Sequence, residues 1–424
     1  MLHSDSGAEF QLLSAQFIKI RQASLAIAAP LSEADIQIQS MPEASPVKWH
    51  LAHTSWAFEA FILKPYIKNY VAFDTHFEYL FNSYYNAIGR QFPRAQRGLL
   101  SRPGYKQILR YRNHIDTEIL HLLDNMAVNG HSKQTTQFFH LMQLVINHEQ
   151  QHQELMLTDL KHGLFINPEY PIYQICKPIK YLKTPLEWKQ YTAGLYTIGH
   201  QNEPFYFDNE GPSHQVYLQP FQLASRLITC GEYLQFVQNG GYQQASFWLS
   251  EAWSKMTQHN IQAPFYWVKK QGNWHQYTLS GLQPLALDSP VMHLNYFEAS
   301  AFANSQNKRL PTEQEWEVAS RGAPLTGTFF NQLIMQPSSA CGVELEQMFG
   351  ELWQWTSSSY NAYPGFKVAE GAIGEYNGKF MVNQYVLRGG SIATPRNHIR
   401  PSYRNFFYPD ACWQFTGIRL AESL

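Results

Sequence analysis

Two histidines lie four residues apart in the string HEQQH, at His148 and His152. Apolar side chains recur at helical spacing from about residue 135 to 162, so we expect both histidines on one face of a long helix. Two imidazoles in this arrangement can bind one metal ion. A pair of surface or core-edge histidines would show the same spacing, so the pair is a candidate and not yet a site.

The same string matches the HExxH pattern of helical zinc proteases, in which Glu149 would be the general base. The extended form of that pattern needs a glycine and a third histidine further along the helix. The chain has Leu155 and Thr158 at those positions. A zinc hydrolase is therefore an alternative interpretation.

A second expected helix offers the third ligand. It runs from Pro46, with Ser45 as its N-cap, to roughly Leu63, and it carries His50 and His53. Facing helices of a bundle place side chains in a shared core, where metal sites are built. Three neutral imidazoles would leave coordination positions open, and on ligand type alone they suit iron, copper or zinc.

The elements that would position these histidines belong to the first of two expected domains in an α+β chain. Helical periodicity fills residues 8–165, which predicts a helix bundle. Residues 166–190 contain four prolines and no periodicity, which is typical of a linker. Residues 191–424 change to short β-like runs such as VYLQPFQLA and YVLRGGS, with a helix expected after Asn295.

Composition limits the function classes. The 424 residues exceed one ordinary core, and a net charge of -1 gives no field that favours nucleic acid or an anionic membrane. The four cysteines form no CxxC pair, and the chain shows neither a leader sequence nor a long apolar run. We expect a cytoplasmic enzyme that acts on small molecules, without a nucleic-acid or membrane partner; composition does not set its oligomeric state.

Longer strings carry a resemblance to a known family. WHLAHTSWAFE and NHEQQHQELMLTDLKH in the first half, and RLPTEQEWEVASRG, GELWQWTSSSY, VLRGGS, RPSYRNFFYP and GIRLA in the second, span nearly the whole chain. They resemble the sulfoxide synthases of ergothioneine biosynthesis (EgtB type). The resemblance implies a DinB-like four-helix bundle followed by a formylglycine-generating-enzyme-like domain with a modified C-type-lectin fold.

The resemblance also implies a metal and a reaction. The family's iron(II) ligands correspond to His53, His148 and His152, which leaves His50 as a structural neighbour. Such an enzyme, a hercynylcysteine S-oxide synthase or hercynine oxygenase, uses oxygen as co-substrate. It joins the sulfur of a thiol to the imidazole C2 of hercynine, the trimethylated histidine, and oxidises that sulfur to a sulfoxide.

Further residues receive roles through the same resemblance. Tyr84 and Tyr85 match a tyrosine pair of the cysteine-using subgroup, where one hydroxyl acts in the oxygen chemistry. Arg94 and Arg97 match positions that bind the carboxylates of the thiol. Without the resemblance, the tyrosines would be read as ordinary packing and the arginines as a solvated basic loop.

Gln151 and Asn405 match residues that hold hercynine. Phe406 and Phe407 stand where the mycobacterial type has Trp and then Asp, so the chain lacks a partner for the amino group of a γ-glutamyl arm. Phe406 can still face a trimethylammonium group through its ring. This departure favours cysteine over γ-glutamylcysteine, although paired aromatics also commonly pack in a core.

The second domain is expected to be a scaffold that supplies one wall of the pocket. Formylglycine generation would need a reactive cysteine pair near the C-terminus, but Cys412 stands alone and Cys341 lies far upstream. Related ovothiol or selenoneine-type synthases remain alternatives. The sequence also leaves open a structural calcium ion in this domain.

Overall fold

The computed structural model of the chain describes residues 5–129, 133–200, 204–330, 334–342 and 344–424. The chain forms two compact units. The helical unit consists of Met1–Ile166 together with Glu370–Tyr376, and the second unit consists of Asn167–Ala369 and Asn377–Leu424. The segment Glu370–Tyr376 thus belongs with the helices, although it lies within the range that we assigned to the second domain.

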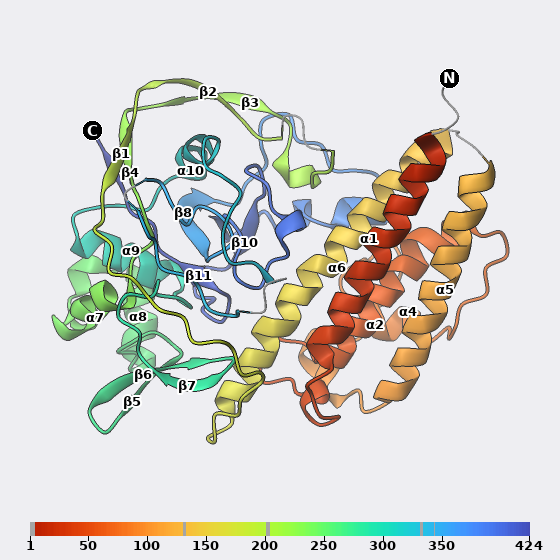
Figure 1. The fold of residues 1–424 in the computed structure, drawn as a ribbon, viewed down its shortest axis with the longest axis horizontal. Coiled ribbons are helices and arrows are strands. Elements are labelled where there is room, and N and C mark those ends of the chain that lie inside the picture. Colours follow the sequence, from red (N-terminus) through yellow and green to blue (C-terminus); the bar gives the residue numbers. More distant parts are fainter. Residues whose placement is uncertain (1–4, 130–132, 201–203, 331–333, 343) are drawn as a thin grey trace. The chain divides into compact units, whose positions relative to one another are not determined.

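In the described part of the helical unit the long helices (Figure 1) are α1 (Asp5–Ala28), α2 (Val47–Phe58), α5 (Tyr105–Asn129) and α6 (Lys133–Ile166). Helix α2 packs against α5 and α6, and α1 packs against the same two helices. Shorter helical segments complete the unit: Asp35–Gln37, a π-helix at Glu59–Leu63, α3 (Lys64–Tyr66), α4 (Phe77–Phe81) and Arg94–Leu99. The predicted helix bundle is confirmed.

Helix α2 is buried along its whole length. Its N-cap residue is Pro46, so the expected N-cap at Ser45 was wrong by one position. Ser45 is used differently, because its backbone N–H donates to Asp159 Oδ2 of α6 over 2.8 Å. Burial on several sides explains why α2 carries apolar residues and histidines with little charge, and it brings His50 and His53 against α6.

The second unit contains short strands, short helices and long loops. Its strands are β1 (Trp188–Tyr191), β2 (Gly194–Ile198), β3 (His214–Leu218), β4 (Phe221–Ala224), β5 (Trp267–Lys270), β6 (Asn273–Thr278), β7 (Gly281–Pro284), β8 (Trp353–Ser359), β9 (Tyr385–Arg388), β10 (Asn405–Phe407), β11 (Thr416–Gly417) and β12 (Ala421–Ser423). Its helices are α7 (Cys230–Gln238), α8 (Ser250–His259), α9 (Tyr296–Ser305) and α10 (Glu313–Ser320). The mixed content of the two units confirms the α+β prediction.

Among the residues that the structure describes, the strands pair in four small sheets, ordered β1-β4-β12, β10-β9-β8-β11, β2-β3 and β5-β6-β7. In the four-stranded sheet β11 runs parallel to β8, and the other pairs are antiparallel. The helix expected after Asn295 is α9, and the Asn295 side chain accepts from the Glu298 N–H over 2.8 Å as its N-cap. Both predicted strand runs are also present, as β3–β4 and β9.

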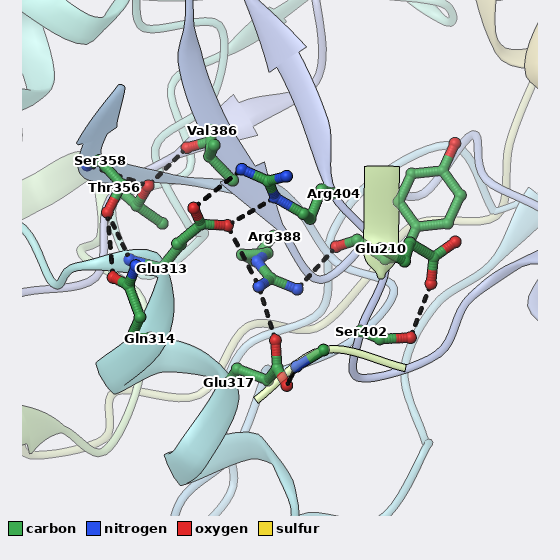
Figure 2. Close-up of polar contacts among 12 residues, drawn as sticks. Glu210, Glu313, Gln314, Glu317, Thr356, Ser358, Val386, Arg388, Ser402 and Arg404 are labelled. Atoms are coloured by element: carbon green, nitrogen blue, oxygen red, sulfur yellow. Dashed lines mark hydrogen bonds and ion pairs between the residues drawn. The ribbon is translucent and has the colours of Figure 1, made fainter. Parts of the chain in front are cut away.

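A buried ion network stabilises the core of the second unit (Figure 2). Arg404 donates to both carboxylate oxygens of Glu313, over 2.8 and 3.0 Å. Arg388 donates to Glu317 over 2.7 Å and to the Tyr403 carbonyl over 3.0 Å. These side chains come from α10, β9 and the loop before β10, so the network links elements far apart in sequence. Removing one partner of such a buried pair typically costs about 3–5 kcal/mol.

No helix in the part of the chain that the structure describes is long and apolar enough to cross a membrane. The four cysteines are free. Cys341 is exposed and Cys412 is half-buried, and neither forms a disulfide.

Candidate metal centre

Three histidines converge in the core of the helical unit. His53 on α2 and His148 and His152 on α6 are all buried, and each offers one ring nitrogen to a common point. The Nε2 atom of His148 lies 3.2 Å from Nε2 of His53 and 3.1 Å from Nε2 of His152. These are the three residues that the resemblance assigned as ligands.

The charge state of the three imidazoles suits metal binding. Burial, together with the neighbouring His148, lowers the pKa of His53 well below its ordinary value. Burial also lowers the pKa of His148 to about 4 and that of His152 well below the usual range. Because the rings are neutral at pH 7, they present lone pairs and do not repel a cation. Three neutral imidazoles with no thiolate among them fit a divalent first-row transition metal.

The tautomer of His53 follows from its second nitrogen. His53 Nδ1 lies 2.6 Å from the Phe81 carbonyl, which can only accept a hydrogen bond. Nδ1 therefore carries the proton, and Nε2 is left as the metal-facing lone pair. The Trp49 ring stacks on the imidazole, with ring centres 4.6 Å apart, and holds its orientation.

The position of Glu149 argues against the zinc hydrolase interpretation. Its buried carboxylate accepts hydrogen bonds from Arg21, Arg112 and the Ser24 hydroxyl. Burial opposes its ionisation, but the charges of Arg112 and Arg21 outweigh burial and lower the pKa of Glu149 to about 2. A carboxylate so strongly held is a poor proton acceptor, which does not favour the alternative interpretation in which Glu149 is a general base.

The two tyrosines lie in the loop after α4 and differ in their surroundings. Tyr85 is fully buried, and it lines a small cavity with residues that include His148. The Tyr84 hydroxyl lies 3.5 Å from the Tyr85 hydroxyl, and Tyr84 does not line this cavity. Burial raises the pKa of Tyr85 well above its ordinary value, with a further contribution from Tyr84, so the Tyr85 phenol keeps its proton at neutral pH.

The segment Glu370–Tyr376, which we call the strap, completes this cavity and was missed by sequence reasoning. Ile373 and Tyr376 line the cavity, and the Tyr376 ring meets the His148 imidazole edge-on with centroids 5.7 Å apart. Glu375 accepts from the backbone N–H groups of Asn86 and Ala87, over 3.0 and 2.7 Å. The strap is therefore tied to the loop that carries Tyr84 and Tyr85.

The two arginines have different environments. Arg97 is buried; its guanidinium stacks 3.4 Å over the Trp49 ring centre, and its Nη1 donates to the Ser45 hydroxyl over 2.9 Å. Among the described residues, the buried Arg97 Nε has no hydrogen-bond partner. Arg94 is exposed and donates to the Glu43 carbonyl. Of Arg94 and Arg97, Arg97 is therefore the one with a buried N–H donor still available to an anion.

Gln151 and the β10 residues lie in different units. Gln151, on α6, accepts a hydrogen bond from the Tyr376 hydroxyl. In the second unit, the side-chain oxygen of Asn405 accepts from the Phe406 N–H over 2.9 Å. Phe406 stacks on Tyr360 with ring centres 4.0 Å apart, and Phe407 is half-buried. Packing accounts for the Phe406 ring, and the substrate roles of Asn405, Phe406 and Phe407 stay predictions.

Comparison with known families gives the same two halves. The DinB superfamily matches residues 16–156, and the sulfatase-modifying factor enzyme 1-like domain matches residues 190–339 and 329–424. The hercynine oxygenase of Mycobacterium tuberculosis is 32% identical over 308 residues, which cover 66% of this chain and 70% of that protein. The hercynine oxygenase of Mycolicibacterium thermoresistibile is 28% identical over 457 residues, covering 96% of this chain and 94% of the relative.

A third relative is ergothioneine biosynthesis protein 1 of Schizosaccharomyces pombe, 30% identical over 246 residues that cover 53% of this chain and 29% of that protein. The helical half, with its histidine triad, and the sheet-rich half each match a known domain, in the order that the resemblance implied. Together with the identity to the Mycobacterium tuberculosis protein over 70% of its length, these matches show that the chain belongs to the hercynine oxygenase family.

Proposed function

We propose that the chain is an iron(II)- and oxygen-dependent sulfoxide synthase that joins the sulfur of cysteine to the imidazole C2 of hercynine. The C2–H and S–H bonds break, and a C–S bond forms. Oxygen accepts two electrons from this coupling and two more from oxidation of the sulfur. One oxygen atom ends on sulfur, and the other leaves as water with the two released protons.

The observation that carries this proposal is the triad of neutral imidazoles in a DinB-like bundle whose relatives are hercynine oxygenases. Iron(II) held by His53, His148 and His152 would supply the redox chemistry between oxygen and the two substrates. Three imidazole ligands alone would leave coordination positions open for other ligands. A site with open positions is typical of catalytic metal centres and not of structural ones.

Side chains around the triad have the properties that the reaction needs. The buried guanidinium of Arg97 suits the carboxylate of a small thiol, because charge-assisted hydrogen bonds are strong away from water. Tyr85 shares a cavity with His148 and holds a proton at neutral pH, so it can donate that proton or a hydrogen bond to reduced oxygen. Gln151, held by Tyr376, is the proposed partner of hercynine on α6.

We infer cysteine as the thiol because of Phe406 and Phe407 on β10. Neither ring can form an ion pair with the amino group of a γ-glutamyl arm. Asn405 on the same strand keeps an amide for hercynine in this proposal. The missing charged partner should make γ-glutamylcysteine a poorer substrate than cysteine, because a hydrogen bond to a charged group is typically worth about 1.5–3 kcal/mol.

The direct test uses the iron(II)-loaded protein with hercynine and either cysteine or γ-glutamylcysteine, first without oxygen and then with ¹⁸O₂. We expect a sulfoxide carrying one ¹⁸O atom, formed only with oxygen and faster with cysteine. Histidine and a selenium donor, offered in separate reactions, test the ovothiol and selenoneine alternatives. His53→Ala should abolish product, whereas His162→Ala, which removes a histidine elsewhere on α6, should not. Peptide hydrolysis that needs zinc and ignores oxygen would contradict the proposal.

A further inference from the structure

A line of buried polar groups runs from His152 away from the metal-facing side. His50 Nδ1 lies 2.8 Å from His152 Nδ1, and His50 Nε2 lies 3.1 Å from Asp159 Oδ2. All three side chains are buried. His50 is one helical turn before His53 on α2, and Asp159 is two turns after His152 on α6, so both helices present these groups on the faces that carry the ligands.

The direction of these hydrogen bonds follows from Asp159. A carboxylate can only accept, and Asp159 Oδ2 receives the backbone N–H of Ser45 as well as the His50 ring. His50 therefore carries its proton on Nε2, and its Nδ1 has a lone pair. The nearby Nδ1 of His152 must then be the donor, which leaves a lone pair on Nε2, the nitrogen that lies 3.1 Å from His148 Nε2.

We propose that Asp159 and His50 form a positioning relay that selects the Nδ1–H tautomer of His152 and so directs its Nε2 lone pair to the metal. For His53 a backbone carbonyl does the same task, since it can only accept. An imidazole can accept or donate, so His50 needs the carboxylate of Asp159 to make it an acceptor. This inference rests on the proposed metal centre, but not on the identity of the substrates or of the reaction.

The relay can be tested first in the metal-free protein without any variant. Long-range ¹H–¹⁵N correlation spectra of the histidine rings distinguish the two tautomers. We expect the proton of His152 on Nδ1 and that of His50 on Nε2. Finding the proton of His152 on Nε2 would overturn the inference, whatever the variants do.

Two substitutions of His50 separate hydrogen bonding from packing. The His50→Asn side chain can donate its N–H toward Asp159 and turn its oxygen toward His152 as an acceptor, whereas His50→Leu can do neither. Loss of a hydrogen-bond partner of a metal-binding histidine typically weakens metal binding about 10–100-fold. We expect His50→Leu to weaken binding of iron(II), or of zinc(II) as a redox-inert probe, by this factor in chelator competition. His50→Asn should stay within several-fold of the native protein.

Asp159→Asn tests the carboxylate, because an amide can present N–H as well as oxygen to His50. We expect the spectra of this variant to show His152 as a mixture of both tautomers, with weaker metal binding. His162→Asn is the comparison variant: His162 lies on α6 three residues after Asp159, and its Nδ1 contacts the Ser40 hydroxyl over 2.7 Å, so the change removes a neighbouring imidazole and keeps both His50 and Asp159. It should bind metal like the native protein.

Two results would contradict the relay in the variants. One is a folded His50→Leu protein with native metal affinity and an unchanged His152 tautomer. The other is equal loss in His50→Asn and His50→Leu, which would assign His50 to packing. Both readouts need no hercynine and no thiol, so a protein that passes them but makes no sulfoxide would refute the proposed function and leave the relay intact.

Discussion

At the scale of single residues, Tyr84 and Tyr85 are adjacent in sequence but differ in what they reach. Tyr85 and His148 line the same cavity, and the Tyr85 phenol is protonated at neutral pH. We expect Tyr85→Phe to divert the reaction from the sulfoxide to simple oxidation of cysteine to its sulfinic acid. General acid catalysis typically contributes about 10²–10⁴-fold, so the product ratio should change by at least about tenfold. Mass spectrometry of both products measures this ratio.

Tyr84→Phe is the matched control for that experiment. It removes a hydroxyl 3.5 Å from the Tyr85 hydroxyl but leaves the cavity wall in place. The sulfoxide should therefore remain its main product. An unchanged product ratio in Tyr85→Phe would contradict the role of Tyr85 in the oxygen step. A larger change in Tyr84→Phe than in Tyr85→Phe would assign that role to Tyr84.

The two arginines allow a second comparison between residues. Arg97→Lys keeps the positive charge. It removes the planar guanidinium that stacks on Trp49, together with the Nε–H donor that has no partner among the described residues of the native protein. We expect the KM for cysteine to rise by about tenfold or more, since a charge-assisted hydrogen bond is worth about 1.5–3 kcal/mol. The KM for hercynine should change little. Steady-state kinetics with each substrate varied in turn measure both effects.

Arg94→Lys should change the KM for cysteine less than Arg97→Lys does, because Arg94 is exposed and its guanidinium already donates to the Glu43 carbonyl. An equal rise in both variants would show that the two arginines share the carboxylate, as the family resemblance implied.

At the scale of elements, one carboxylate ties the strap to the loop that carries Tyr84 and Tyr85. Glu375 accepts from two consecutive backbone N–H groups, those of Asn86 and Ala87. We expect Glu375→Ala to speed hydrogen exchange of these amides and to speed proteolysis within Glu370–Tyr376, because these exposed hydrogen bonds tie the segment to the loop. Glu370→Ala, which removes an exposed carboxylate from the same strap, is the control. Unchanged exchange in Glu375→Ala would show that Tyr376 and Ile373 hold the strap without it.

The sequence predicted the two ligand helices but not the strap, for a physical reason. Helix α6 has apolar residues at a repeat of three to four, and this repeat directly sets which residues share a face. The histidine pair was therefore visible as a candidate. The strap sequence EGAIGEY has neither helical nor alternating periodicity, and its place beside the helices depends on contacts between positions almost 300 apart in the chain.

The second coordination layer was only partly visible in the sequence. The spacings of His50 to His53 and of His152 to Asp159 place each pair on one helix face, which is a usable signal. The direction of the hydrogen bonds between the helices cannot be predicted from these spacings, because it depends on how α2 and α6 face each other. The N-cap shows the same limit: Ser45 fits the statistical preference for a cap, but its N–H and hydroxyl are used by Asp159 and Arg97.

At the scale of the whole molecule, stability depends on a buried acid in the second unit. Glu298 on α9 accepts from the Asn295 N–H over 3.0 Å and from the Tyr242 hydroxyl over 2.7 Å. Burial raises its pKa from 4.5 to about 7, although these two hydrogen bonds act in the opposite direction. The folded protein therefore binds a proton at Glu298 over a pH range in which the unfolded chain has released it.

The sign of the effect on stability follows from proton linkage. Between pH 4.5 and about 7 the folded state holds more protons at Glu298 than the unfolded state does, so the free energy of unfolding falls as the pH rises through this window. Glu298→Gln removes the titration and keeps an acceptor oxygen. We expect the free energy of unfolding of the variant to rise relative to that of the native protein, by on the order of 3 kcal/mol between pH 4.5 and 8. Urea unfolding at several pH values measures the difference.

The control is Glu370→Gln, which changes an exposed carboxylate. Its free energy of unfolding should depend on pH in the same way as that of the native protein. If the Glu298→Gln curve does so too, Glu298 is ionised in the folded protein and a counter-charge must lie beside it.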